Sequence, residues 1–220
     1  QITQAKEQAD IVIVTLHGGN EYFPYPRPGL RKLCQHYIDL GVEAVICHHP
    51  HVPGAYEYHQ DKPIIYSLGN FIFDNAKPPK NWGLGYMARL NIDIESKKFT
   101  SLELMPYKQS VELGGVQLLQ GKEKQAILKE IESYRHNLEN HQAWLKEWQD
   151  FVEKQSNSYI FFQFFPVTFR GLGLLARHTP IAKLLFTRKN SLPKLNMLRC
   201  QSHSELLTAV LEANSQLRND

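Results

Sequence analysis

The sequence predicts an α/β protein in which a βαβ unit and antiparallel strands are followed by a helical extension. Three observations predict this class: a strand–helix–strand pattern near the start, two later pairs of strand-like segments, and a charged, helix-patterned region beyond them. The pattern changes near residue 118. We therefore expect an α/β part over residues 1–118 and a helical C-terminal extension over residues 119–220.

The βαβ unit comes first. The apolar run 11–16 is rich in β-branched residues and leucine, which is typical of a strand covered on both faces. Residues 31–40 have apolar side chains at helical spacing, and Gly41 suits the end of that helix. A second apolar run, 43–47, completes the unit, so we expect its two strands to be parallel.

Antiparallel strands are predicted next. Segments 56–59 and 63–67 flank a polar turn, which is a hairpin pattern. Segments 85–95 and 99–107 flank the turn at 96–98 in the same way. We expect these antiparallel additions to form the second sheet of a sandwich. Beyond them, residues 123–152 predict one long amphipathic helix or two shorter ones.

Histidines follow both strands of the βαβ unit. His17 ends the first strand, and His49 and His51 follow the second. The carboxyl ends of parallel strands meet at one edge of a sheet, so these imidazoles are expected to converge. Neutral imidazole is a common ligand of divalent transition metals. A lone histidine at a strand end is more often a hydrogen-bonded residue, so the predicted metal site depends on this clustering.

Three imidazoles suit one zinc-like ion in an open site. Two ions a few ångströms apart would need bridging carboxylates in addition. His48 lies within the same cluster, but side chains alternate along an extended chain, so it is expected to face away from His49 and His51. We interpret His48 as a candidate for supporting the metal ligands or for donating a proton.

Three motifs carry a resemblance to a known family: His17-Gly-Gly-Asn-Glu21-Tyr22, the segment 41–52 with His48-His49-Pro50-His51, and Tyr66-Ser67-Leu68-Gly69-Asn70-Phe71. In this order they resemble the CapA-type capsule synthesis family. That family is associated with bacterial poly-γ-glutamate capsules and has the calcineurin-like metallophosphatase fold. The resemblance covers roughly residues 1–110. The chain departs from the family pattern at Gly18, where an aromatic is usual, and at Cys47, where glycine is usual.

The resemblance implies roles for individual residues. His17, His49 and His51 would bind a divalent metal, manganese or zinc. Glu21 would hold a ligand or a water molecule next to the site. In the hydrolase interpretation, His48 would protonate a leaving group.

The third motif would serve the substrate. Ser67 and Asn70 would form a tight turn near the floor of the cleft and contact the substrate there. Gly69 and Asn70 tolerate positive φ, so an equally good interpretation is that this turn only shapes a strand bend.

The resemblance also implies that the chain is the C-terminal part of a calcineurin-like sandwich. Only sixteen residues precede His17, and they contain none of the family's early carboxylate and asparagine ligands. The missing N-terminal half of the same domain is therefore an expected partner, and the intact parent is expected to hold two ions. The fragment alone is expected to be inactive.

Two classes of function fit these features. One is a metal-dependent, phosphoesterase-like hydrolase in the intact parent, within capsule synthesis or unrelated to it. The other is a non-catalytic scaffold or export component that binds an anionic polymer. The expected ligand is an anionic polymer or a phosphoester, and the expected location is the bacterial cell envelope, membrane-associated or extracellular.

Composition limits the alternatives. The formal net charge of +3 is too small to predict nucleic-acid binding. No apolar run is long enough for a spanning helix. Residues 159–189 combine aromatic and basic side chains, which suits an anionic membrane surface, although packing against the long helix is the interpretation we favour. A final helix is predicted over 204–217. Three dispersed cysteines (34, 47 and 200) do not predict a disulfide framework.

Overall fold

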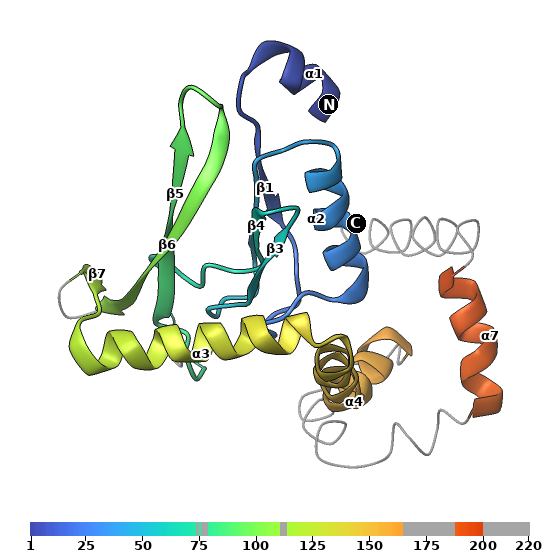
Figure 1. Cartoon of the computed structure of the whole chain (residues 1–220). Helices are drawn as coiled ribbons and strands as arrows, with labels where there is room; N and C mark the ends of the chain where they lie inside the picture. The colour runs from blue at the N-terminus through green and yellow to red at the C-terminus, as the bar shows by residue number, and fades with distance from the viewer. Residues whose placement is uncertain (74, 76–78, 111–113, 165–187, 200–220) are drawn as a thin grey trace, which may run out of the picture. The chain divides into compact units, whose positions relative to one another are not determined.

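The structure is a computed structural model that describes residues 1–73, 75, 79–110, 114–164 and 188–199. The chain divides into two compact units, Gln1–Phe151 and Val152–Asp220. The first unit contains both sheets and all the predicted site residues (Figure 1). In the second unit the structure describes the end of α4, which spans His141–Phe164, and α7, which spans Arg188–Arg199.

A four-stranded sheet of order β1-β2-β4-β3 contains the βαβ unit. The parallel strands β1 and β2 are joined by α2, as the sequence predicts, and β4 is parallel to β2. The hairpin of β3 and β4 is antiparallel and is confirmed, but it belongs to this first sheet rather than to the second. The elements are β1 (Ile13–His17), α2 (Pro28–Asp39), β2 (Ala44–His48), β3 (Tyr56–His59) and β4 (Lys62–Ile65).

Strand β1 lies at the edge of its sheet. Its residues alternate between exposed and half-buried, and Ile13 is 40% exposed. The prediction that this run is covered on both faces is therefore wrong for the described part of the chain. Val14 and Leu16 pack into the core, whereas Ile13 and Thr15 face away from it.

The second sheet has the order β5-β6-β7 and is antiparallel. Its long strands β5 (Leu84–Asp93) and β6 (Lys98–Ser110) correspond to the second predicted pair. The short strand β7 (Gly115–Leu118) was not predicted, nor was the helix α1 (Ile2–Gln8) that precedes β1. An isolated bridge between Gly69 and Gly85 brings the two sheets together.

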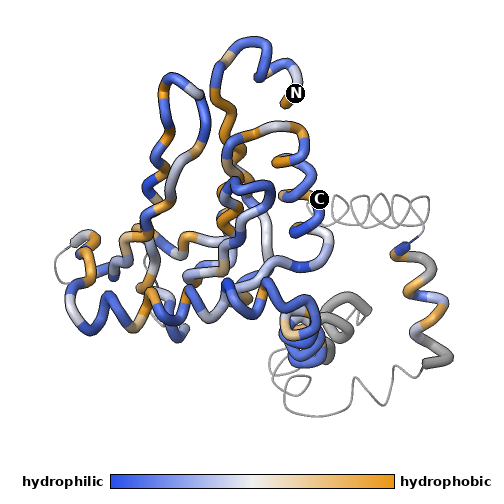
Figure 2. Tube along the Cα trace, viewed as in Figure 1, coloured by the Kyte–Doolittle hydropathy of each residue, from blue (hydrophilic) through white to orange (hydrophobic). Residues whose placement is uncertain are grey.

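The core lies on both faces of the first sheet. Ile64 and Ile65 are fully buried neighbours on β4, and they belong to different apolar clusters because side chains alternate across a strand. Ile64 packs with α2, whereas Ile65 packs with Tyr86 of the second sheet. The hydropathy colouring shows apolar residues along the central strands and polar residues along most of α3 (Figure 2).

The predicted helical region 123–152 is confirmed, in its two-helix alternative. Helix α3 (Gly121–Glu139) runs along the base of both sheets, and α4 follows after a break at Asn140 (Figure 1). Ile131 and Leu138 of α3 are buried, as is Trp144 of α4. Helix α3 and the start of α4, up to Phe151, are therefore part of the first compact unit. The predicted domain boundary after residue 118 stays a prediction.

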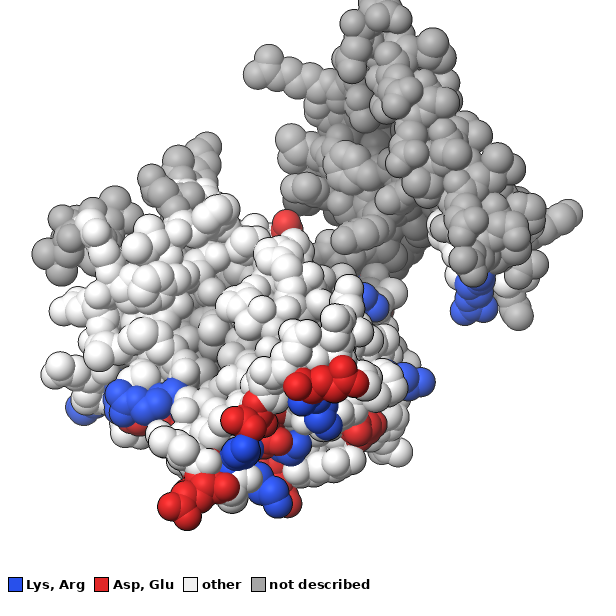
Figure 3. Space-filling model, turned by 90° about the horizontal axis from the view of Figure 1, so that it is seen from above, with Lys and Arg blue, Asp and Glu red and all other residues white. Residues whose placement is uncertain are grey.

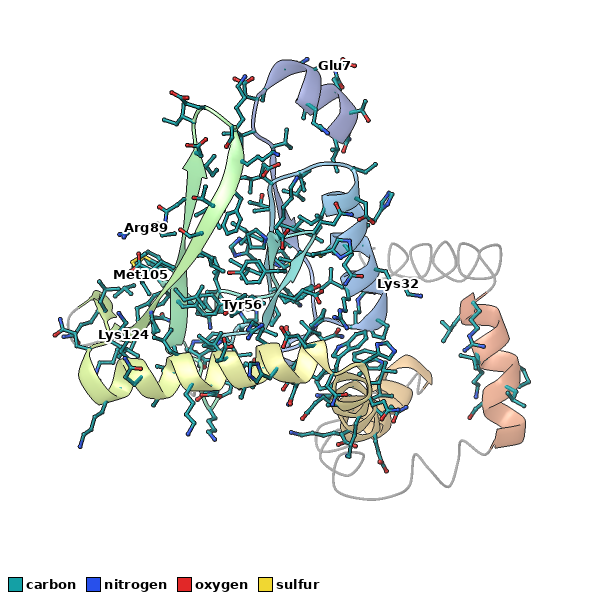
Figure 4. The ribbon with its side chains drawn as sticks, viewed as in Figure 1. Glu7, Lys32, Tyr56, Arg89, Met105 and Lys124 are labelled. Carbon is teal, nitrogen blue, oxygen red and sulfur yellow. The ribbon has the colours of Figure 1, made fainter. Side chains whose placement is uncertain are left out.

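Tyr56 illustrates how α3 joins the sheets. Its ring lies in the interior above α3, whereas Lys32 and Arg89 point outward (Figure 4). The Tyr56 hydroxyl donates a 3.0 Å hydrogen bond to the Glu132 carboxylate of α3. Burial and this neighbouring carboxylate raise the pKa of Tyr56 well above its usual value. Tyr56 is thus a neutral hydrogen-bond donor between two elements.

The architecture confirms an α/β protein with parallel and antiparallel sheets. The more specific assignment to the calcineurin-like fold stays a prediction. Among the helices that the structure describes, none is long and apolar enough to cross a membrane. The predicted helix 204–217 and residues 165–187 of the aromatic and basic segment lie outside the described residues.

Candidate functional site

The two histidine loops lie side by side at the carboxyl edge of the first sheet. His17 of β1 is paired with His48 of β2 in the strand register. Beyond the strands, the Gly18 N–H donates to the His48 carbonyl at 2.9 Å, and the Tyr22 N–H donates to the Pro50 carbonyl at 2.8 Å. These backbone bonds fasten the loop after β1 to the loop after β2.

Gly19 lets the loops approach this closely. Its φ is +135°, and a Cβ atom there would lie 2.8 Å from Cγ of Pro50. Any other residue would therefore meet both an unfavourable backbone conformation and a steric clash. Close packing of the two loops thus explains the second glycine of the first motif.

His17 and His49 are in direct contact. Nε2 of His17 lies 3.1 Å from Nδ1 of His49, and the rings meet nearly edge to face with centroids 5.0 Å apart. Two nitrogen ligands of a tetrahedral zinc ion, each about 2.05 Å from the metal, lie about 3.3 Å apart. The spacing of this imidazole pair therefore fits two positions of a metal site.

His51 lies next to this pair but is held by Asn70. Its ring centroid is 5.6 Å from that of His49. Nδ1 of His51 lies 2.8 Å from Oδ1 of Asn70, while Nδ2 of Asn70 donates to the carbonyls of His51 and Trp82. Because an amide oxygen only accepts, Nδ1 of His51 carries the proton in this arrangement. Nε2 of His51 keeps its lone pair, as metal-binding histidines do when their other nitrogen donates to a carbonyl.

Aromatic rings fix the plane of His51. It packs nearly parallel to Phe73 and to Trp82, with centroids 5.4 Å and 5.2 Å away. Trp82 is 6% exposed, and its Nε1 donates to the carbonyl of Phe73. The His51 ring is therefore held both in its plane and in its tautomer.

The loop backbone is strained at both histidines after β2. His49 has φ +113° and His51 has φ +63°, in a region that non-glycine residues rarely adopt. Such conformations cost about 1–3 kcal/mol each and gather at functional sites, where the surrounding structure enforces them. This strain marks the His49–His51 loop as a functional candidate independently of its residue types.

Of the three predicted histidines, His17 and His49 are thus in contact, and His51 lies next to them. Within the described ranges, no three His, Cys, Asp or Glu side chains are grouped so that they could hold a metal ion. The donor chemistry fits a divalent ion, but two imidazoles alone leave half of a tetrahedral site open. The metal assignment of His17, His49 and His51 stays a prediction.

The two predicted catalytic residues lie at the rim of the cluster. His48 is exposed, and its pKa is lowered by partial burial and by the charge of the neighbouring His17. A lowered pKa favours the neutral imidazole at pH 7, which accepts protons rather than donating them. Glu21 is also exposed, and in the described part of the chain no hydrogen bond joins it to a histidine. Both roles stay predictions.

The third motif builds the turn beneath His51. Ser67 is buried, its hydroxyl donates to the Val52 carbonyl at 2.7 Å, and it accepts from the Gly69 N–H. Gly69 has φ +80°, and a Cβ atom there would lie 2.5 Å from the Leu84 carbonyl oxygen. These contacts give Ser67 and Gly69 positioning roles. Substrate contact by Ser67 and Asn70 stays a prediction.

Asn20 was missed by the sequence analysis. Its Oδ1 atom is buried and has no hydrogen-bond partner among the described residues. An unpaired buried carbonyl oxygen is uncommon and calls for an explanation, such as a bound ligand or water. Its only sequence signal is its place inside the first motif, between Gly19 and Glu21.

The surface charges do not single out a partner. On the face shown in Figure 3, the basic and acidic side chains of the described residues intermingle along one margin, and most of the visible surface is uncharged. At the candidate site, imidazoles and aromatic rings contact one another.

The fold and the site together define an α/β protein with an imidazole cluster at the carboxyl edge of its parallel strands. The family model described as bacterial capsule synthesis protein PGA_cap matches residues 1–75, which contain both histidine loops and the turn beneath them. The resemblance to the CapA-type family is thereby confirmed for this part of the chain.

Curated proteins agree with that match. The PGA biosynthesis protein CapA of Bacillus subtilis (strain 168) is 44% identical over 75 residues, which are 34% of this chain and 20% of that protein. The capsule biosynthesis protein CapA of Bacillus anthracis is 40% identical over 80 residues, again 34% and 20% of the two chains. A probable polyglutamine synthesis accessory protein of Mycobacterium tuberculosis is 32% identical over 74 residues, with the same shares. The matched region spans 20% of the length of each of these relatives.

Proposed function

We propose that this chain is part of a CapA-type protein of capsule biosynthesis and that its histidine loops contribute to a divalent metal site. One observation carries the proposal: the 3.1 Å contact of His17 and His49 at the ends of neighbouring parallel strands. Both histidines lie in the segment that matches the capsule synthesis family model. The proposed role in capsule and poly-γ-glutamate biosynthesis follows the names of the two Bacillus relatives.

In this proposal His17, His49 and His51 hold the metal, which is manganese or zinc. A bound ion would supply a Lewis acid and an activated water for hydrolysis of a phosphoester or a related bond. Nδ1–H of His51 donates a hydrogen bond to Oδ1 of Asn70, which leaves Nε2 of His51 free, and the aromatic neighbours keep the ring oriented. The loops themselves are kept together by the backbone bonds that join Gly18 to His48 and Tyr22 to Pro50.

Further polypeptide of the same protein is the proposed partner that completes the site. The outer edge of β1 has no neighbouring strand among the described residues. A strand added there in parallel would place its own carboxyl end beside His17, since parallel strands end at the same sheet edge. Carboxylates delivered in this way would allow the second ion that two-metal chemistry requires. The chain alone is then expected to show no turnover.

The metal content of the full-length protein tests the proposal. We expect the wild type to bind manganese or zinc after dialysis and the double variant His49→Ala, His51→Ala to lose most of it, as measured by inductively coupled plasma mass spectrometry. His36→Ala is the matched control, because His36 is exposed on α2 outside the cluster. Equal metal content in wild type and double variant, with circular dichroism showing both folded, would refute the site.

The cell envelope, membrane-associated or extracellular, is the proposed location, because capsule polymers are built there. A scaffold or export component that binds the anionic polymer is the second candidate. Phe73, which stacks on His51 and is 51% exposed, favours it as a contact for a bound chain. Loss of metal without loss of capsule production would select this second candidate.

A further inference from the structure

Cys34 and Cys47 meet in the core between α2 and β2. Their Sγ atoms lie 3.6 Å apart, and both residues are 0% exposed. They are separated by 13 positions in the sequence, and only the packing of α2 on β2 brings them together. The sequence spacing of the dispersed cysteines gives no sign of this contact.

We propose that Cys34 and Cys47 form a disulfide site that joins α2 to the strand carrying the histidine loop. A disulfide bond is about 2.0 Å long, so the two sulfur atoms need to approach by about 1.6 Å. The sulfurs already face each other at contact distance, and the approach requires side-chain rotation with a small shift of α2. Neither sulfur has to leave the core.

The chemistry needs an oxidant, for which we name a disulfide of the glutathione or thioredoxin-like class. Each thiol loses its proton, a sulfur–sulfur bond forms between Cys34 and Cys47, and the two electrons reduce the oxidant's disulfide to two thiols. Both sulfurs are out of reach of solvent once the core has packed. The exchange therefore belongs to folding, before α2 closes over β2.

The bond would act on the site through β2. Cys47 is followed directly by His48 and His49, and β2 pairs with β1 up to His17. A covalent link from α2 to the end of β2 limits how far this strand end can move. The same link closes a short loop in the unfolded chain and so reduces its conformational entropy.

Refolding of the 220-residue chain tests the proposal. The chain is unfolded with reductant and refolded with or without a mixture of oxidised and reduced glutathione. Cleavage after Glu43 then separates the two cysteines into different peptides. Mass spectrometry without reductant should find these two peptides joined in the sample refolded under oxidising conditions.

Two variants make the result specific. Cys200→Ser removes the third cysteine of the sequence and should still give the joined peptides. Cys47→Ala should remove them. In the Cys200→Ser background, oxidation should raise the melting temperature by roughly 5–10 °C, as expected for a short loop in a protein of this size.

Three outcomes would overturn the proposal. The first is free thiols at both positions after oxidative refolding of Cys200→Ser. The second is pairing of either cysteine with Cys200 in the wild type in place of the proposed bond. The third is a joined pair with a lowered melting temperature. The last would show that the bond distorts the native core. Because none of these measurements involves a metal or a substrate, failure here leaves the proposed metal site untouched.

Discussion

Nδ1 of His51 lies 2.8 Å from Oδ1 of Asn70, and Asn70 is only 7% exposed. This buried amide therefore serves the imidazole and the loop carbonyls at the same time. Replacing Asn70 with alanine removes the partner of the half-buried His51 imidazole and the bond to the His51 carbonyl, whereas the Trp82 carbonyl still accepts from Gln109. We expect Asn70→Ala to lower the free energy of unfolding by about 1–3 kcal/mol per unpaired group, as measured by urea denaturation.

Asn91→Ala is the control for this change. Asn91 also donates a side-chain hydrogen bond, to Ser101 at 2.8 Å, but it does so in an exposed part of β5. Its loss should cost clearly less, since water replaces the partner. Similar losses in the two variants would show that the Asn70 amide does not support His51.

His17→Ala distinguishes an enzyme from a scaffold. In the full-length protein this change removes one half of the imidazole pair while the backbone of β1 stays paired with β2. If the protein is a metal-dependent hydrolase, we expect hydrolysis of a phosphoester or γ-glutamyl substrate to fall by more than the roughly 10–100-fold that follows loss of a residue supporting a metal ligand. Unchanged capsule production by cells carrying this variant would favour the scaffold.

The buried ion pair of Arg31 and Glu57 should be costly to break. Glu57 is 6% exposed and accepts hydrogen bonds from Arg31, Gln35 and Tyr66. The change Glu57→Gln keeps the shape but leaves the Arg31 charge without its counterion. We expect a loss of about 3–5 kcal/mol in the free energy of unfolding, measured by chemical denaturation.

The matched change on the surface is Glu103→Gln. Glu103 pairs with Arg89 at 2.7 Å, but both side chains are about half exposed. Exposed pairs contribute about 0–1 kcal/mol, so this variant should unfold almost like the wild type. A large loss in the free energy of unfolding for Glu103→Gln, or a small one for Glu57→Gln, would show that burial does not distinguish the two ion pairs.

Glu43 should make stability depend on acid pH. Burial raises the pKa of this carboxyl, but hydrogen bonds from Lys62 and from the Phe99 N–H outweigh it, so the net pKa lies below its usual value of 4.5. A carboxyl with a lowered pKa in the folded state stabilises the protein above the unfolded pKa. That contribution disappears as the pH falls below 4.5 and through the folded value.

The measurement compares wild type with Glu43→Gln in urea between pH 7 and pH 3. We expect the wild type to be the more stable above pH 4.5 and the difference to shrink at lower pH. Glu95→Gln, at an exposed carboxyl of the turn between β5 and β6, serves as the control. A difference that stays constant over the whole range would contradict the lowered pKa of Glu43.

Leu138 tests whether α3 folds together with the sheets. It is 0% exposed and belongs to the cluster around α2 and β2. Leu138→Ala should cost about 2–5 kcal/mol and shift the unfolding of the whole unit, followed by circular dichroism. Leu118→Ala, at a position that is 50% exposed, should cost under about 1 kcal/mol. A small loss at Leu138 would place α3 outside the folding unit.

Periodicity and strand-end position predicted much of this fold. The apolar runs before His17 and His48 and the helical spacing between them predicted the βαβ unit, and the strand 56–59 was predicted with its observed bounds. Strand direction then predicted that His17 and His49 approach each other. These features depend on local patterns and on the rule that parallel strands end at one edge.

Contacts between distant side chains could not be predicted in this way. The packing of Phe73 and Trp82 on His51 and the contact of Cys34 with Cys47 arise only when separate elements pack together. The same holds for the exposure of Ile13, because a β-branched run looks alike at the edge and at the centre of a sheet. The positive φ of His49 has no signature in its residue type.

The backbone bonds between the loops after β1 and β2 have a consequence for engineering. The Gly18 and Tyr22 N–H groups find their acceptors only in the other loop, at His48 and Pro50. A chimera that grafts one loop from a related protein keeps these bonds only where the grafted backbone follows the same course past Pro50, which Gly19 permits here. Transplantation of the two segments as a matched set is therefore the smallest exchange that preserves the geometry.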